Sequence, residues 1–164
     1  MTPAARAGLL ALLKRHEGTG PTRGDRVFPY RDRGGKGKLT IGYGRNIKDN
    51  GITRLEAEYL LENDVFRSEL EARRAFPWIA TLAPARQVVI VELVFAMGIP
   101  RVQGFRKMLG ALAAGDMAGA SRELLDSDWA REVGTGTDRR AGMLAAMLRS
   151  GAWPEGIVGG LSDV

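Results

Sequence analysis

The stretch YRDRGGKGKLTIGYGRN, residues 30–46, decides how the fold can be interpreted. Within "KLTIGYG", larger apolar side chains alternate with small or polar ones, and this alternation predicts a strand. The segment "RGGKGK" predicts the turn before that strand, and "VFPY", residues 27–30, predicts the strand before the turn. Gly42 and Gly44 fall on one face, so another group can approach that backbone closely. We therefore predict a small, glycine-rich hairpin sheet.

The stretch RHEG, residues 15–18, predicts the end of a helix just before this sheet. Thr-Pro at residues 2–3 predicts where that helix begins, and Gly18 can end it. Glu17 lies four residues beyond Leu13, so it continues the same apolar stripe. We expect a carboxyl group on the buried edge of the last turn, where the helix dipole disfavours a negative charge.

Further helices are predicted after the sheet. A capping box at Thr53–Glu56 opens a helix that continues to about Arg74. Pro84 begins an apolar helix that ends near Gly98. This helix is too short to cross a bilayer, and we interpret it as a buried core helix.

Shorter helices are expected over about 101–113, 116–127 and 138–149. Asp116 and Asp138 are the predicted caps of the last two. Two tryptophans are predicted anchors of the helical core; they are Trp129 and Trp153. Residues 19–26 are polar and glycine-rich, and we expect a loop there.

The order of these elements predicts an α+β fold: a helix, a hairpin sheet, a long helix and a helical bundle. We expect a single domain over residues 1–164, with two lobes and a cleft between them. The small lobe would span about 15–60, and the helical lobe about 75–164 together with the N-terminal helix. A long helix would join the lobes.

Composition narrows the chemistry. The chain has 164 residues, 24 Lys and Arg, 19 Asp and Glu, and a formal net charge of +5. Such a surface favours a polyanionic partner such as nucleic acid, an anionic membrane or an acidic cell-wall polymer. There is no cysteine, and His16 is the single histidine, so thiolate chemistry and a multi-histidine zinc site are excluded. Hydrolysis would have to rest on carboxylates and hydroxyls, without a metal or cofactor.

These motifs, taken in order, resemble the T-even phage lysozyme family, the phage-type muramidases. The resemblance covers nearly the whole chain and includes blocks in both predicted lobes. The blocks are RHEG at 15–18, PYRD at 29–32, KLTIGYGRN at 38–46, GITRLEAEYLLENDV at 51–65, VFAMG at 94–98, GFRKML at 104–109 and RSGAW at 149–153. The resemblance implies a lysozyme-like fold and cleavage of the β-1,4 bond between N-acetylmuramic acid and N-acetylglucosamine in peptidoglycan.

The resemblance also implies a catalytic constellation. The family's glutamate, aspartate and threonine fall on Glu17, Asp32 and Thr40. Glu17 suits the proton donor, Asp32 the charged partner, and Thr40 the group that holds the attacking water. We expect an inverting hydrolysis, for which the two carboxyl groups lie roughly 6.5–9.5 Å apart. Asp25 and Asp49 compete with Asp32 for its role.

Two departures from the family pattern stand out. The loop from Glu17 to Asp32 and the turn from Asp32 to Thr40 are both longer here. Arg45 replaces the histidine that some members carry after the second glycine of "GYG", which implies that a structural pair of the family is rewired. His16 is expected to be structural or exposed.

In the second lobe, the resemblance assigns substrate-side roles to Phe95 and Arg140. An arginine at the start of the late helix reaches the catalytic glutamate in the family, and Arg139 is the neighbouring alternative. Phe95 matches a cleft-lining position, although a core position explains it nearly as well. Met108 and Glu123 stand where the family's polar contact residues differ, so no sugar contact is carried over to them.

Three other functions remain open on the sequence. A lytic transglycosylase also uses a single glutamate, but it leaves an anhydro sugar. A non-catalytic binder of peptidoglycan or nucleic acid would suit the basic charge, yet the basic residues are scattered and lack an aromatic stacking platform. Membrane disruption could involve the last two helices, which carry Arg139, Arg140 and Arg149.

The expected partners follow from this comparison. We expect peptidoglycan as the substrate, no nucleic acid, a weak contact with anionic membranes, and a monomer. No signal peptide or membrane anchor is recognisable in the sequence, so we expect synthesis in the cytoplasm of a host bacterium and holin-dependent release. A prophage or bacteriocin-like origin fits equally well.

Overall fold

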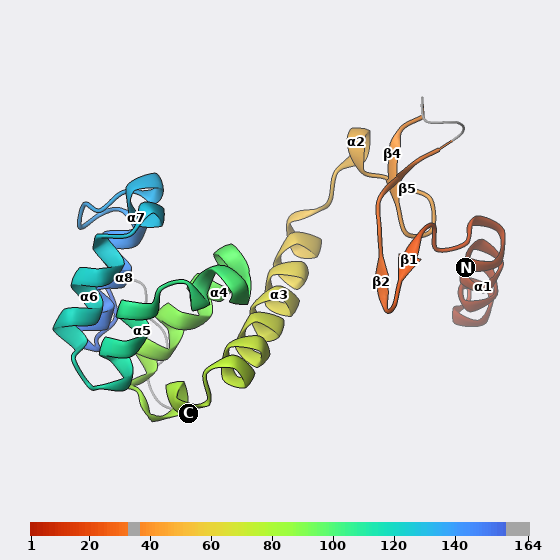
Figure 1. The fold of residues 1–164 in the computed structure, drawn as a ribbon. Coiled ribbons are helices and arrows are strands. Elements are labelled where there is room, and N and C mark those ends of the chain that lie inside the picture. The colour runs from red at the N-terminus through yellow and green to blue at the C-terminus, as the bar shows by residue number, and fades with distance from the viewer. Residues whose placement is uncertain (33–36, 157–164) are drawn as a thin grey trace. The chain divides into compact units, whose positions relative to one another are not determined.

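The computed structural model describes residues 1–32 and 37–156. The chain divides into two compact units, Met1–Tyr59 and Leu60–Val164. The boundary between them falls inside one long helix, α3 (Arg54–Ala75), which Figure 1 shows in yellow. The division of the chain into lobes remains a prediction.

Unit 1 begins with helix α1 (Pro3–Glu17), and both predicted ends are confirmed. The Thr2 hydroxyl accepts a 3.2 Å hydrogen bond from the Ala5 N–H, and the Gly18 N–H donates to the Lys14 carbonyl. Gly18 adopts φ 65°, a conformation that favours glycine. The prediction that Glu17 lies on a buried edge of this helix is wrong, because α1 has no buried residue and Glu17 is exposed.

A two-stranded sheet follows where a loop was expected. Strands β1 (Thr22–Arg23) and β2 (Arg26–Val27) pair antiparallel, so the loop prediction over 19–26 is wrong in this part. Gly24, with φ 60°, lies in the two-residue turn between them. Such a turn favours residues that tolerate positive φ, and "Gly-Asp" is one such pair.

The second sheet is the predicted hairpin with one more strand. Its strands β3 (Tyr30–Arg31), β4 (Leu39–Ile41) and β5 (Arg45–Asn46) are antiparallel in that order. Tyr30 pairs with Thr40, and Thr40 pairs with Asn46. Residues 33–36 of the predicted "RGGKGK" turn lie outside the described residues.

Two details of the strand prediction are wrong. Strand β4 ends at Ile41 because Gly42 and Gly44 adopt φ of 60° and 81°, which turn the chain back into β5. Of "VFPY", only Tyr30 belongs to β3, while Val27 ends β2.

Two helices complete the first unit and lead into the second. The short α2 (Ile47–Asn50) is capped by Asn46. The predicted capping box at the start of α3 is confirmed: the Glu56 N–H donates to the Thr53 hydroxyl, and the Glu56 carboxylate accepts from the Thr53 N–H at 2.7 Å.

Unit 2 is helical. Its elements after α3 are η1 (Pro77–Thr81), α4 (Pro84–Gln103), α5 (Arg106–Ala113), α6 (Met117–Leu125), α7 (Asp128–Val133) and α8 (Arg140–Ser150). Helix α4 is broken at Gly98, with φ 74° and ψ 162°, close to the predicted end of the apolar helix. Helix α7 was not predicted.

The hydrophobic core lies in unit 2. Helix α6 packs against α5 and α8, and α4 also packs against α8. Figure 1 shows these helices together in green and blue. The central residues of α4, such as Ile90 and Leu93, are fully buried, which confirms it as a core helix. Trp129 is buried in the core as predicted, but Trp153 is 40% exposed and is no core anchor.

Of the two predicted caps, one is confirmed. The Asp116 carboxylate accepts a 2.7 Å hydrogen bond from the Gly119 N–H at the start of α6. Asp138 caps nothing: Arg139 is the cap residue of α8, and no side chain caps that helix end. Helix α8 therefore begins two residues later than the prediction.

No single helix among the described residues is both long and apolar enough to cross a membrane. Helices α4 and α5 taken together have the length and apolar composition of a membrane span, but the chain bends by 100° between them.

Candidate functional site

The Glu17 carboxyl group lies against the turn between β4 and β5. A Cβ atom added to Gly44 would be 3.0 Å from Glu17 Oε2, so a larger residue there would push the carboxyl aside by a few tenths of an ångström. Lys14, one turn earlier on α1, lies with its ammonium 5.8 Å from the centre of the Tyr43 ring. The close approach expected at Gly42 and Gly44 is found at Gly44 alone, where the approaching group is the predicted proton donor, and nothing lies within 4 Å of a Cβ added to Gly42.

Asp32 follows β3 directly, at the start of the enlarged turn. Its N–H donates to the Lys38 carbonyl at 3.4 Å, and its carbonyl accepts from the Gly37 N–H at 3.1 Å. Arg31 Nη1 donates to the Gly37 carbonyl at 3.2 Å. These bonds close the two ends of the turn on each other, so the backbone position of Asp32 is set by the β3–β4 ladder. Its side chain is exposed.

Thr40, in the middle of β4, is the one buried residue among the described residues of unit 1; it is 5% exposed. Its hydroxyl donates to the Lys38 carbonyl at 3.0 Å. The same carbonyl accepts the Asp32 N–H, so one oxygen anchors both residues. Because its proton is engaged, the Thr40 hydroxyl oxygen retains only lone pairs for a further partner.

The competing carboxylate Asp49 is engaged in a local network. It forms an ion pair with Lys38 and accepts a 3.0 Å hydrogen bond from Asn46 Nδ2. The hydrogen bond from Lys38, followed by that from Asn46, lowers the pKa of Asp49. The hydrogen bond to Asp49 raises the pKa of Lys38, and Asp32 adds a smaller electrostatic effect in the same direction. Asp25, the other competitor, lies exposed at the tip of the β1–β2 hairpin.

Arg45 forms an ion pair whose partner could not be identified from the sequence. Its Nη1 forms an ion pair with Glu56, and its Nε donates to the Gly51 carbonyl at 3.1 Å. Glu56 also accepts from Thr53, and the Thr53 N–H is the main cause that lowers the pKa of Glu56. The network therefore links β5 to the first turn of α3.

The two substrate-side candidates lie in unit 2. Phe95, on α4, is 42% exposed rather than buried, which disfavours the core interpretation. Arg140, the first residue of α8, donates from Nε to Glu92 Oε1 at 2.9 Å. Its guanidinium carbon also lies 5.9 Å from the centre of the Trp129 ring. Glu92 and Phe95 are three residues apart on α4 and so lie on neighbouring positions of one helix face.

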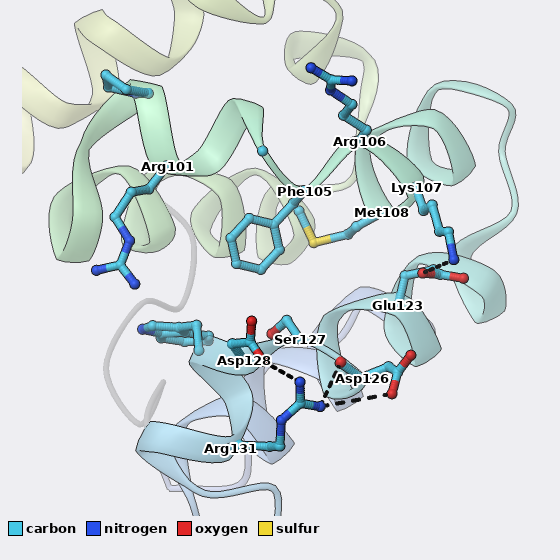
Figure 2. Close-up of a pocket in the computed structure, with 13 residues that line it drawn as sticks. Arg101, Phe105, Arg106, Lys107, Met108, Glu123, Asp126, Ser127, Asp128 and Arg131 are labelled. Atoms are coloured by element: carbon cyan, nitrogen blue, oxygen red, sulfur yellow. Dashed lines mark hydrogen bonds and ion pairs between the residues drawn. The ribbon is translucent and has the colours of Figure 1, made fainter.

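Unit 2 also contains a pocket that the sequence did not reveal. Figure 2 shows it between the segment that carries Phe105 and the start of α7, with a volume of about 650 Å³. Phe105, Met108 and Trp129 supply apolar surface, and Arg131 at its edge forms ion pairs with Asp126 and Asp128. The segments "FRKM" (105–108) and "DSDW" (126–129) are both rich in charged and aromatic residues. They are far apart in the sequence, and the packing of α5 against α6 brings them together.

No group of three or more histidine, cysteine, aspartate or glutamate side chains in the described part of the chain could hold a metal ion.

Comparison with known families decides the identity. A family model described as phage lysozyme matches residues 16–145, from the end of α1 through both sheets and into α8. The chain belongs to the phage lysozyme family. No curated protein matched it. As a phage lysozyme, it has the α+β, lysozyme-like fold that the sequence predicted, and its family-level activity is that of a glycosidase that hydrolyses peptidoglycan.

Proposed function

We propose that this phage lysozyme is an endolysin that hydrolyses the β-1,4 bond between N-acetylmuramic acid and N-acetylglucosamine with inversion, and so lyses bacterial cells. Glu17 donates a proton to the leaving oxygen, and Asp32 is the carboxylate on the other side of the bond. The observation that carries the proposal is the position of the Glu17 carboxyl beside Gly44, 3.0 Å from where a Cβ atom would be. This places the acid beside the sheet formed by β3, β4 and β5. Thr40 lies on β4 of that sheet, and Asp32 follows β3 directly.

Thr40 has the hydrogen-bonding state that water activation needs. Since its proton is donated to the Lys38 carbonyl, the hydroxyl oxygen accepts a hydrogen bond from the attacking water. A water that donates to Thr40 and to a carboxylate directs a lone pair towards the sugar carbon. Asp32 is the favoured carboxylate because Asp49 is already paired with Lys38 and Asn46.

Three features of unit 2 supply substrate contacts in this proposal. Arg140 uses one N–H group on Glu92, which leaves further guanidinium donors for a carboxylate or hydroxyl of the substrate. Phe95 offers an exposed ring for the apolar face of a sugar. The pocket beside Phe105 and Trp129 combines aromatic surface with both cations and carboxylates, which suits a polar, partly apolar part of peptidoglycan.

The decisive test compares wild type with Glu17→Gln on outer-membrane-permeabilised Gram-negative cells. We expect turbidity clearing to fall by roughly 100-fold or more, because general acid catalysis contributes about 10²–10⁴-fold. Glu58→Gln, which neutralises an exposed glutamate of α3, is the matched control and should clear normally. Full activity of Glu17→Gln would exclude Glu17 as the acid.

Product analysis separates the proposed reaction from its alternatives. Mass spectrometry of digested cell wall should reveal reducing ends with water added. Anhydro sugars would instead identify a lytic transglycosylase, and undiminished lysis by an inactive variant would identify membrane disruption.

Delivery and assembly form the last part of the proposal. We expect a monomer that acts on the cell wall after holin-dependent release from the host cytoplasm, with weak binding to anionic membranes through Arg139, Arg140 and Arg149. Size-exclusion chromatography and a vesicle-binding assay measure the assembly state and the membrane contact.

A further inference from the structure

The turn that carries Gly44 is held from two sides. On one side, the Lys14 ammonium lies 5.8 Å from the centre of the Tyr43 ring, which ties the turn to α1. On the other side, Arg45 pairs with Ile41 across the β4–β5 ladder. Gly44 lies between these two attachments, and Glu17 Oε2 lies 3.0 Å from the position that a Cβ atom on Gly44 would occupy.

The side chain of Arg45 extends the second attachment beyond the sheet. It contacts the Gly51 carbonyl with Nε and the Glu56 carboxylate with Nη1, so two different N–H groups of one planar group are used. Glu56 is itself fixed, because it accepts from both the N–H and the hydroxyl of Thr53 at 2.7 and 2.9 Å. The guanidinium is therefore bound to a partner that belongs to the first turn of α3.

We propose that Arg45 and Glu56 are a positioning pair for the proton donor and act through the backbone of Gly44 on Glu17. The inference rests on the proposed function, since it requires Glu17 to be the acid. Arg45 need not touch the substrate. It fixes the turn against which the Glu17 carboxyl rests. An ion pair with both partners about 40% exposed contributes little to the free energy of unfolding. Variants of this pair should therefore reduce catalysis more than they reduce stability.

Three variants test the pair. Arg45→Ala removes both contacts, and Arg45→Lys keeps the charge but not the two-point geometry. Glu56→Gln weakens the ion pair while glutamine still serves in the capping box, so the start of α3 is preserved. Arg67→Ala is the control, because Arg67 forms a 2.7 Å pair with Asp64 on α3 at similar exposure.

The expected result is a split between kcat and KM on soluble peptidoglycan fragments. Arg45→Ala should lower kcat roughly tenfold, since displacement of a catalytic group by about 1 Å can cost up to about 100-fold. KM should stay within about twofold, because no ground-state contact is removed. Arg45→Lys should recover part of the loss, and the double variant with Glu56→Gln should lose no more than Arg45→Ala alone.

A spectroscopic measurement separates positioning from general loss of structure. In carbon-detected NMR at fixed pH, the carboxyl carbon of Glu17 should shift in Arg45→Ala and in Glu56→Gln but not in Arg67→Ala. If Arg45→Ala fails to fold, Arg45→Lys and Glu56→Gln carry the same test.

Two results would overturn the inference. One is a folded set of Arg45 and Glu56 variants with wild-type kcat and an unchanged Glu17 signal. The other is a double variant in which the two losses multiply, because the residues would then act independently. Glu17→Gln, measured in the same assay, distinguishes failure of the proposed function from failure of the positioning role. If Glu17→Gln is inactive while the Arg45 variants are normal, only the positioning role fails.

Discussion

At the scale of single residues, the proposed site depends on the close approach of the Glu17 carboxyl to Gly44. The two glycines of the β4–β5 turn have similar backbone conformations, with φ of 60° and 81°, but different surroundings. Nothing lies within 4 Å of a Cβ added to Gly42, whereas one added to Gly44 meets the Glu17 carboxyl. Substitutions at Gly42 and Gly44 can therefore separate the effect of backbone strain from the effect of displacing the Glu17 carboxyl.

We predict that Gly44→Ala and Gly42→Ala each reduce the free energy of unfolding by about 1–3 kcal/mol, because both place a Cβ in the left-handed region. Only Gly44→Ala should also displace the carboxyl of Glu17 and lower activity by roughly a further tenfold. Chemical denaturation and lysis assays on both proteins measure the two effects. Equal activity of the two folded variants would contradict the importance of this contact.

Sequence reasoning located these residues only in part. The order of Glu17, Asp32 and the "LTIGYG" segment indicated the family and the candidate positions, and paired glycines indicated a close approach. It could not identify Glu92 as the partner of Arg140, since the two are 48 positions apart and meet only through packing of α4 on α8. It also could not reveal the exposure of Glu17, which depends on tertiary contacts rather than on the helical stripe.

At the scale of elements, prediction succeeded where one local signal is strong. The capping box before α3, the proline that begins α4 and the glycine that breaks it are each visible in a few consecutive residues. Helices α2 and α7 and strands β1 and β2 were missed because each has six residues or fewer, too short to display a period.

The two predicted aspartate caps provide a direct energetic comparison. We expect Asp116→Ala to reduce the free energy of unfolding by about 0.5–2 kcal/mol, since it leaves the Gly119 N–H without its partner. Asp138→Ala should change this free energy little, because the ion pair described for Asp138 is a 3.9 Å surface pair with Arg139. Urea denaturation of both variants measures the difference, and equal losses would contradict the capping assignment.

At the scale of the whole molecule, buried apolar side chains are distributed unevenly. Among residues 1–32 and 37–156, every residue of the hydrophobic core lies between Ala72 and Leu148, in unit 2, while Thr40 is the one buried residue of unit 1. Since apolar burial is the main source of stability, the two units should differ in how readily they open.

We therefore predict that the slowest-exchanging backbone amides lie in α4, α6 and α8, with opening free energies close to that of global unfolding. Amides of α1 and of the strands should exchange at lower free energies. Native-state hydrogen exchange at several denaturant concentrations measures this. Equal protection of β4 and α4 would mean that the core of unit 2 does not dominate stability.

The bonds that close the turn after β3 have a consequence for sequence variation. Asp32 is bonded to Gly37 and Lys38 across the neck of that turn, and the ladder continues from there to Tyr30 and Thr40. Residues inserted between Asp32 and Gly37 would leave these hydrogen bonds in place, and each doubling of the length of a flexible loop costs only about 0.6 kcal/mol in closure entropy. Evolution can therefore insert residues at this point without shifting the register of the strands, and protein engineers can use it as a site for grafting a peptide.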